Sequence, residues 1–210
     1  MADLKILFEA ILTGDQKTAV AFTEQALAEK IDPQELISGA MIPAMNEAGK
    51  RFECEEYFVP ELLLAARAMK GSLTLLRPLL AASGAEPIGR VVIGTVKGDL
   101  HDIGKNLVSS MLEGAGFEVI DLGADVSAEK FVAAVRNEKP NIVCMSALLT
   151  VTMPSMKATI EALNTAGVRD GVKVMVGGAP VTPDYAREIG ADGYADNAST
   201  AVARARELVA

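Results

Sequence analysis

Apolar side chains in the first 80 or so residues recur with the spacing of amphipathic helices. The first stripe comprises Leu4, Leu7, Phe8, Ile11 and Leu12. Gly14 and Asp15 follow this stripe, and we expect them to end the first helix and begin the second. Asp32 and Pro33 suit the N-cap and first turn of a third helix, which Pro43 should kink. This part of the chain therefore predicts a helical domain.

A fourth helix is expected to begin at Pro60 and to run through residues 61–69. It is apolar on more than one side, whereas a helix in a four-helix bundle needs only one apolar stripe. Two interpretations fit this pattern. The helix is either the central helix of the bundle, or it also faces another domain or a ligand.

The pattern changes after a stretch rich in glycine, serine and proline, which predicts a linker over residues 78–89. Short apolar runs then alternate with helical patterns. The predicted strands cover residues 91–96, 117–120, 142–145, 172–176 and 193–195. Five such units indicate an open parallel sheet with helices on both faces, in the flavodoxin-like order 2-1-3-4-5. The sequence predicts an all-α four-helix bundle over residues 1–84 and an α/β domain over residues 85–210.

Composition and charge narrow the classes of partner. The 210-residue chain is 50% hydrophobic and has a formal net charge of −8. An acidic surface repels phosphate groups, which disfavours nucleic acid and anionic membrane surfaces as partners. We find no secretory signal and no apolar run of membrane-spanning length, so we expect a cytoplasmic protein with reduced thiols at Cys54 and Cys144.

The single histidine, His101, follows the first predicted strand. In open α/β sheets, ligands bind beyond the carboxyl ends of the strands, where the strand order reverses. That rule selects the loop with Asp99 and His101 and the loop after Met145. Asp99 is placed to hold one ring nitrogen of His101 and to leave the other free as a base or metal ligand. A histidine that only makes local hydrogen bonds is the simpler alternative.

Several kinds of site do not fit these loops. A zinc site needs three or four ligands, and the chain has no second histidine and no paired cysteines. Ser146 lacks the glycine-flanked turn of a hydrolase nucleophile. Gly94, Gly98 and Gly104 do not have the spacing of a dinucleotide-binding turn. A cofactor that carries its own metal and needs one axial imidazole fits best.

Three separated motifs support this hypothesis. Asp99-x-His101-x-x-Gly104 is followed after 41 residues by Ser146-x-Leu148, and after 28 more by Gly177-Gly178. This pattern resembles the cobalamin-binding signature of methyltransferases and mutases, including the cobalamin module of methionine synthase. In that family the benzimidazole of the cofactor leaves the cobalt, a histidine replaces it, and the nucleotide tail enters a slot beside the sheet.

The resemblance implies a role for each matching residue. His101 would be the lower axial ligand of the cobalt, and Asp99 would accept its N–H, with Ser146 joining this hydrogen-bond relay. Leu148, Gly177 and Gly178 would line the tail slot, where a side chain on either glycine would collide with the nucleotide. The complete set of cofactor-binding candidates is Gly98, Asp99, Leu100, His101, Asp102, Ile103, Gly104, Ser146, Leu148, Thr150, Gly177 and Gly178.

The helical part resembles the same family more narrowly. Residues 46–52, 57–62 and 65–69 are similar to the helical cap of corrinoid proteins that carry methyl groups in methanogenic and acetogenic methyltransferase systems. Such a cap would shield the methyl face of the corrin, and Met45, Tyr57 and Phe58 are candidates for this contact. The predicted linker would be the hinge that lets the cap swing aside.

The resemblance implies a methyl carrier in anaerobic one-carbon metabolism rather than a complete enzyme. Its cofactor would alternate between cob(I)alamin and methylcobalamin. A substrate-specific methyltransferase would load the methyl group, an acceptor methyltransferase would remove it, and a reductive activase would restore the reduced cobalt. Methanol, methylamines, glycine betaine and aryl methyl ethers are all possible donors. A cobalamin-dependent mutase subunit and a cobalamin-dependent sensor or regulator are the alternatives.

Overall fold

The computed structural model describes residues 3–83 and 87–210, which form two compact units. One unit comprises Met1–Pro87 with Glu113–Gly116, and the other comprises Ile88–Leu112 with Phe117–Ala210. The domain boundary that the sequence predicts between residues 84 and 85 lies outside the described residues. Within the described ranges, no helix is both long and apolar enough to cross a membrane.

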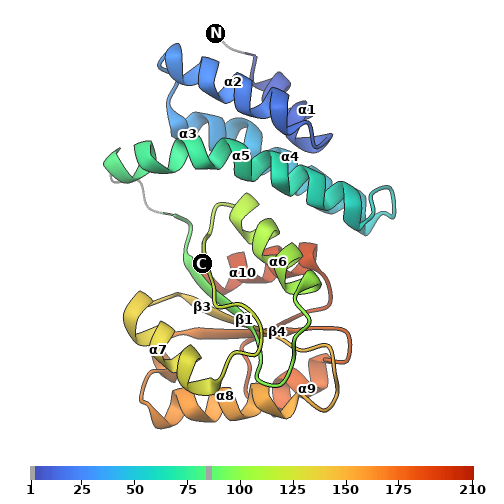
Figure 1. Cartoon of the computed structure of the whole chain (residues 1–210), viewed down its shortest axis with the longest axis vertical. Helices are drawn as coiled ribbons and strands as arrows, with labels where there is room; N and C mark the ends of the chain where they lie inside the picture. The colour runs from blue at the N-terminus through green and yellow to red at the C-terminus, as the bar shows by residue number, and fades with distance from the viewer. Residues whose placement is uncertain (1–2, 84–86) are drawn as a thin grey trace. The chain divides into compact units, whose positions relative to one another are not determined.

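The first unit is helical, as the sequence predicts (Figure 1). Its elements are α1 (Leu4–Leu12), α2 (Gln16–Ala28), α3 (Pro33–Leu36), the π-helical η1 (Ile37–Met41), α4 (Ile42–Glu53) and α5 (Val59–Ser83). Asp15 caps α2 by accepting the backbone N–H of Thr18 at 3.0 Å, and Asp32 caps α3. The largest fully buried side chains of this unit are Leu7, Ile11, Leu36, Met41, Leu62, Met69 and Leu76. These side chains form the core of the helical unit.

Two details of the helical unit differ from the sequence-based prediction. The expected kink at Pro43 is a π-helical turn, Ile37–Met41, directly before α4. Proline cannot donate the usual backbone hydrogen bond, and a wider turn relieves the crowding of its ring. The predicted linker began at Pro78, but α5 continues through Pro78 to Ser83, so that boundary was wrong. A proline near the end of a long helix disrupts few of its hydrogen bonds.

The second unit is a five-stranded parallel sheet with the order β2-β1-β3-β4-β5, which confirms the predicted fold. The strands are β1 (Arg90–Thr95), β2 (Glu118–Asp121), β3 (Ile142–Ser146), β4 (Lys173–Gly177) and β5 (Gly193–Ala195). The helices are α6 (Ile103–Gly114), α7 (Ala128–Glu138), α8 (Pro154–Thr165), the 3-10 turn η2 (Arg169–Gly171), α9 (Pro183–Glu188) and α10 (Ala198–Val209). Each crossover therefore contains a helix, as parallel strands require.

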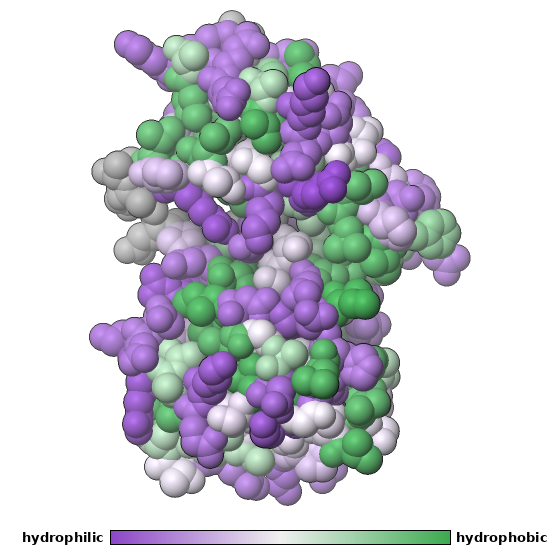
Figure 2. Space-filling view, viewed as in Figure 1, coloured by the Kyte–Doolittle hydropathy of each residue, from purple (hydrophilic) through white to green (hydrophobic). Residues whose placement is uncertain are grey.

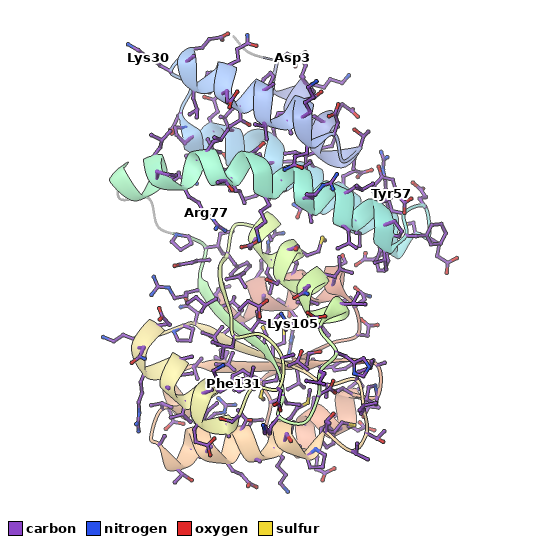
Figure 3. The ribbon with its side chains drawn as sticks, in the orientation of Figure 1. Asp3, Lys30, Tyr57, Arg77, Lys105 and Phe131 are labelled. Carbon is purple, nitrogen blue, oxygen red and sulfur yellow. The ribbon has the colours of Figure 1, made fainter. Side chains whose placement is uncertain are left out.

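Helices cover both faces of this sheet. Helices α7, α8 and α9 lie on one face and α6 and α10 on the other (Figure 1). Phe131 of α7 is fully buried against the first face, among Val92, Val143 and Val174 (Figure 3). Ser127 caps α7 and Thr182 caps α9, as predicted. The order of the strands reverses between β1 and β3, and the carboxyl ends of these two strands carry the candidate site.

Candidate functional site

A fully buried carboxylate, Asp99, organises the loop that follows β1. Its Oδ1 accepts the backbone N–H of His101 at 3.0 Å and lies 3.0 Å from the His101 ring atom Nδ1. Its Oδ2 accepts the backbone N–H of Leu148 at 2.7 Å and the hydroxyl of Thr152 at 2.8 Å. Asp99 therefore joins the loop after β1 to the loop after β3.

These contacts set the charge of Asp99. Burial alone would raise its pKa, because an apolar environment disfavours the ionised form. The hydrogen bonds from Leu148, His101 and Thr152 outweigh burial and hold the pKa of the Asp99 carboxyl well below its usual range. Asp99 is therefore a carboxylate at neutral pH, and it can only accept hydrogen bonds.

The ionised state of Asp99 fixes the tautomer of His101. Because the carboxylate accepts, Nδ1 carries the proton, and the lone pair of the second ring nitrogen, Nε2, is left available. The His101 side chain is 54% exposed, and Thr95 holds the backbone of the same residue by donating its hydroxyl to the His101 carbonyl at 2.9 Å. The chain thus presents one oriented imidazole at the edge of the sheet, and no hydrogen bond to its second ring nitrogen is found among the described residues.

Apolar side chains are exposed in the loops that carry and flank His101. Leu100 and Ile103 are each 76% exposed and Val151 is 80% exposed, although such side chains are usually buried. The exposed apolar residues in these two loops and at the first position of α6 are Leu100, Ile103, Leu148, Leu149 and Val151. A gathering of exposed apolar side chains marks a binding surface. It suits a large ligand with an apolar face placed over the imidazole.

The other candidates around the first motif lie in the same loop or in the first turn of α6. Gly98 has φ +86°, a conformation that glycine adopts without strain, and its N–H is accepted by Asp125 at 2.8 Å. Asp102 is exposed and accepts the side-chain amide of Asn106 at 3.0 Å. Gly104 is in the first turn of α6, and a Cβ built there meets no atom within 4 Å. The space above Gly104 is thus open to a ligand.

The set of hydrogen-bond partners around Asp99 differs from the sequence-based expectation. Ser146 ends β3 and is partly buried, beside Thr95 and Gly177 in the sheet register. Asp99 accepts the hydroxyl of Thr152, a residue that the predicted relay does not include, and the role of Ser146 in that relay stays a prediction. The chain turns after Leu149, whose carbonyl accepts the Thr152 N–H at 3.0 Å, and this turn brings Thr152 to the carboxylate. Sequence reasoning missed Thr152, because only this turn reveals it.

A row of small residues crosses the sheet at its carboxyl edge. Thr95, Ser146, Gly177 and Ala195 are neighbours in register and point to one face, away from the α7–α9 core. This face is the one that α6 and α10 cover (Figure 1). Leu148 and Thr150 are exposed in the adjoining loop. Four small residues thus stand side by side at this edge of the sheet.

The chain itself requires both glycines of the Gly177-Gly178 pair. A Cβ on Gly177 would lie 2.8 Å from the carbonyl oxygen of Ala195, and one on Gly178 would lie 1.9 Å from that of Ala147. Gly178 also has φ +127°, which side chains rarely adopt. The predicted collision with a nucleotide is therefore not needed to explain these glycines, since the backbone of the protein already excludes a side chain.

The three candidate cap residues have different surroundings. Met45 is 2% exposed and belongs to the bundle core. The Tyr57 hydroxyl donates to the carbonyl of Leu12 at 3.2 Å, and Arg51 lies 5.3 Å from the centre of the Tyr57 ring, at the end of the bundle (Figure 3). Phe58 is 64% exposed, next to exposed Val59. Of the three, Phe58 is the one free to contact a ligand.

Hydrophobic surface also covers the beginning of α5 in Figure 2. Its exposed apolar residues include Phe58, Val59, Leu63 and Leu64. An exposed apolar area of this kind suits contact with another apolar surface. The start of α5 is therefore the part of the helical unit best suited to cover a ligand.

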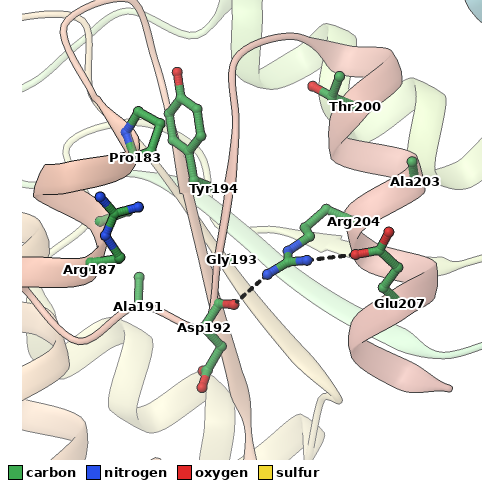
Figure 4. A pocket seen from close by; sticks show the side chains of 11 residues that line it. Pro183, Arg187, Ala191, Asp192, Gly193, Tyr194, Thr200, Ala203, Arg204 and Glu207 are labelled. Carbon is green, nitrogen blue, oxygen red and sulfur yellow. Dashed lines mark hydrogen bonds and ion pairs between the residues drawn. The ribbon is translucent and has the colours of Figure 1, made fainter.

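A separate pocket of about 460 Å³ lies along the open edge of β5, between α9 and α10 (Figure 4). Arg204 crosses it, pairing with Glu207 at 2.6 Å and donating to the carbonyl of Asp192 at 3.3 Å. A charged side chain over an edge strand hinders pairing with other strands. None of the candidate site residues lines this pocket.

Comparisons with known proteins agree with the geometry of the site. Two family models, each described as a B12 binding domain, match residues 89–203 and 4–77. The chain belongs to the B12-binding family. A dimethylamine corrinoid protein from Methanosarcina barkeri is 45% identical to this B12-binding protein over 99% of the chain and 97% of its own length. A trimethylamine corrinoid protein from Methanosarcina barkeri is 46% identical over 94% of the chain and 92% of its own length.

A solved structure agrees with the fold. The B12-binding protein superposes on a chain of the methanol:cobalamin methyltransferase complex from Methanosarcina barkeri with a TM-score of 0.86. The two are 31% identical, and the match covers 98% of this chain and 79% of the other. Both units thus have counterparts in proteins named for corrinoids or cobalamin. This match over nearly the whole length favours the methyl carrier over a mutase subunit or a sensor.

Proposed function

We propose that this protein binds cobalamin, that His101 would supply a nitrogen ligand to its cobalt, and that the protein carries a methyl group between two methyltransferases. Bound cobalamin supplies the cobalt that accepts and releases the methyl group. The observation that carries the proposal is the Asp99–His101 pair, in which a buried carboxylate fixes Nδ1–H and leaves Nε2 free among exposed apolar residues. An imidazole held in this way is suited to a metal that brings its other ligands.

The residues present fit the cofactor. The exposed side chains of Leu100, Ile103 and Val151 offer an apolar surface to the macrocycle, and the open space above Gly104 leaves room for it. The row of small residues that includes Ser146 and Gly177 would form the floor of the tail slot, with Leu148 and Thr150 beside its mouth. Within the helical unit, Phe58 and its apolar neighbours on α5 are the exposed apolar side chains best suited to contact such a ligand.

Asp99 would control how strongly His101 holds the cobalt. As a carboxylate it makes the imidazole a better electron donor through the Nδ1–H bond. With or without a metal at Nε2, the Asp99 carboxylate would accept the Nδ1–H of His101 and hold the ring in one orientation. Because hydrogen bonds hold its pKa low, Asp99 stays ionised and acts only as an acceptor for this N–H. Asp99 would thus keep the imidazole oriented towards the site of the cobalt.

The methyl donor is best sought among methylated amines. The dimethylamine and trimethylamine corrinoid relatives are 45% and 46% identical to this chain, whereas the protein of the methanol complex is 31% identical. A substrate-specific methyltransferase would therefore load the methyl group from an amine. An acceptor methyltransferase would remove it, and a reductive activase would restore the cofactor after oxidation. We propose that the protein works in the cytoplasm, where its thiols remain reduced.

Reconstitution tests this function. The purified protein is loaded with cobalamin, reduced, and mixed with a methylated amine and the amine methyltransferase from the same organism. We expect the absorption spectrum of methylcobalamin to appear, and to disappear when an acceptor methyltransferase and its thiol are added. A protein that binds no corrinoid would contradict the proposal. Binding without methylation by any amine system would contradict only the choice of donor.

A further inference from the structure

Asp125 lies in the loop between β2 and α7, outside every motif that the sequence analysis selects. Its φ of +53° is in the left-handed region, which costs a residue other than glycine about 1 kcal/mol and is least unfavourable for aspartate and asparagine. A strained backbone persists where the surrounding contacts fix it. The contacts of Asp125 show what holds it in this conformation.

Asp125 binds three consecutive residues of the loop that carries His101. Its Oδ1 accepts the backbone N–H of Gly98 at 2.8 Å, and its Oδ2 accepts the Lys97 ammonium at 3.0 Å. Its own backbone N–H donates to the carbonyl of Asp99 at 2.9 Å. One residue thus contacts the side chain of residue 97, the amide of residue 98 and the carbonyl of residue 99.

These contacts act on the residue that orients His101. Asp99 is fully buried, and its carboxylate must point to the His101 ring and to the loop after β3 at once. The direction of that side chain follows from the backbone of the 97–99 turn, which includes the left-handed Gly98. On the opposite side, the Ser155 hydroxyl donates to the Lys97 carbonyl at 3.0 Å. The turn is therefore held from two elements distant in sequence.

We infer that Asp125 is a positioning residue for the Asp99–His101 pair, holding the 97–99 turn so that the imidazole keeps one tautomer and one direction. The inference rests on the proposed function, since it concerns how the cobalt ligand is presented. Asp125 does not touch His101, and it acts through the backbone of Gly98 and Asp99. Its strained conformation is the one that brings its N–H and its carboxylate to the same turn.

Two variants of Asp125 and one control variant separate the effect of its side-chain contacts from the effect of its strained backbone. Asp125→Gly removes both side-chain contacts and tolerates the left-handed φ, whereas Asp125→Asn keeps an oxygen for the Gly98 N–H. Lys139→Gly is the matched control, because Lys139 is also a non-glycine residue with positive φ (+47°), exposed at the end of α7. It relieves comparable strain on another element.

The first measurement uses the cofactor-free protein. His101 is the only histidine, so nitrogen-15 histidine labelling gives one pair of ring resonances. At a fixed pH above neutrality, we expect the wild type, Asp125→Asn and Lys139→Gly to show the resolved shifts of a single Nδ1–H tautomer. In Asp125→Gly the two shifts should move towards each other as the tautomers mix. Wild-type shifts in folded Asp125→Gly would overturn the inference.

The second measurement uses protein loaded with cobalamin and reduced to Co(II). We expect Asp125→Gly to bind the corrinoid but to lose part of the histidine nitrogen hyperfine signal in electron paramagnetic resonance, which the two other variants retain. An unchanged signal would overturn the inference. If Asp125→Gly does not fold, Asp125→Ser, whose side chain is too short for both contacts, replaces it with the same expectations. A wild-type protein that binds no corrinoid would contradict the proposed function, while the cofactor-free measurement would still decide the role of Asp125.

Discussion

Gly104 gives a direct test of where the cofactor lies. It is the second residue of α6, its φ lies outside the left-handed region, and a Cβ there would meet no atom within 4 Å. The protein itself therefore does not require glycine at this position. Alanine is favoured over glycine in a helix interior by as much as about 1 kcal/mol. We expect cofactor-free Gly104→Ala to be at least as stable as the wild type.

The same substitution should weaken cofactor binding. If the corrin occupies the open space above Gly104, the added methyl group crowds it. Crowding of one methyl group in a well-packed interface costs about 1–3 kcal/mol. Because 1.4 kcal/mol corresponds to a factor of ten in the dissociation constant, binding should weaken roughly 5- to 150-fold. Titration of the cofactor-free protein with cobalamin, followed by absorbance, measures this change.

Gly178→Ala is the matched comparison. Its Cβ would lie 1.9 Å from the carbonyl oxygen of Ala147, at a φ of +127°. We therefore expect this variant to lose stability without any cofactor, as urea unfolding would measure. Unchanged stability would show that the backbone clash does not explain this glycine. A Gly104→Ala variant that binds cobalamin as tightly as the wild type would refute the placement of the cofactor above α6.

Three further predictions follow from individual contacts. Thr152→Val removes the hydroxyl that donates to the Asp99 carboxylate, so the free energy of unfolding should fall by about 1.5–3 kcal/mol. Thr152→Ser keeps a hydroxyl and should retain most of the wild-type stability. Equal stabilities of Thr152→Val and the wild type in urea would contradict this contact. The pKa of Asp99 is lower in the folded protein than in the unfolded chain, where it is about 3.9. Ionised Asp99 therefore stabilises the fold at pH values above about 3.9, and this stabilisation is lost as the pH falls further. In urea unfolding, the free energy of unfolding should fall less between pH 6 and pH 3.5 for Asp99→Asn than for the wild type. An identical fall in the two proteins would show that Asp99 does not cause this pH dependence. Phe58→Ser should change stability by less than about 0.5 kcal/mol, whereas Met45→Ala should cost about 2–5 kcal/mol, and the reverse order would contradict their assigned burial.

The sequence is most informative where the chemistry is local. The apolar runs and their spacing predict the five parallel strands and their order, and the caps at Ser127 and Thr182 are visible from residue types alone. Asp99 and His101 are two residues apart, so their pairing is also a local property. These features need no knowledge of distant contacts.

The features that sequence reasoning missed depend on contacts between distant segments. Thr152 is 53 residues from Asp99, and Asp125 is 27 residues from Gly98, and neither has a local pattern that indicates its partner. Pro78 predicted the end of a helix, but α5 continues past it. The glycines at 177 and 178 suggested a ligand, yet the adjacent backbone already accounts for them. Tertiary structure decides each of these cases.

In the proposed function, the Nε2 atom of His101 binds the cobalt. Because the chain has one histidine, labelling with nitrogen-15 histidine changes a single nitrogen that could serve as this ligand. Electron paramagnetic resonance of the Co(II) protein should show hyperfine triplets with nitrogen-14 that become doublets with nitrogen-15. In His101→Ala, which should still bind the corrinoid through its tail, this splitting should disappear. Triplets that persist in the labelled protein, or a splitting unchanged in His101→Ala, would contradict the assignment.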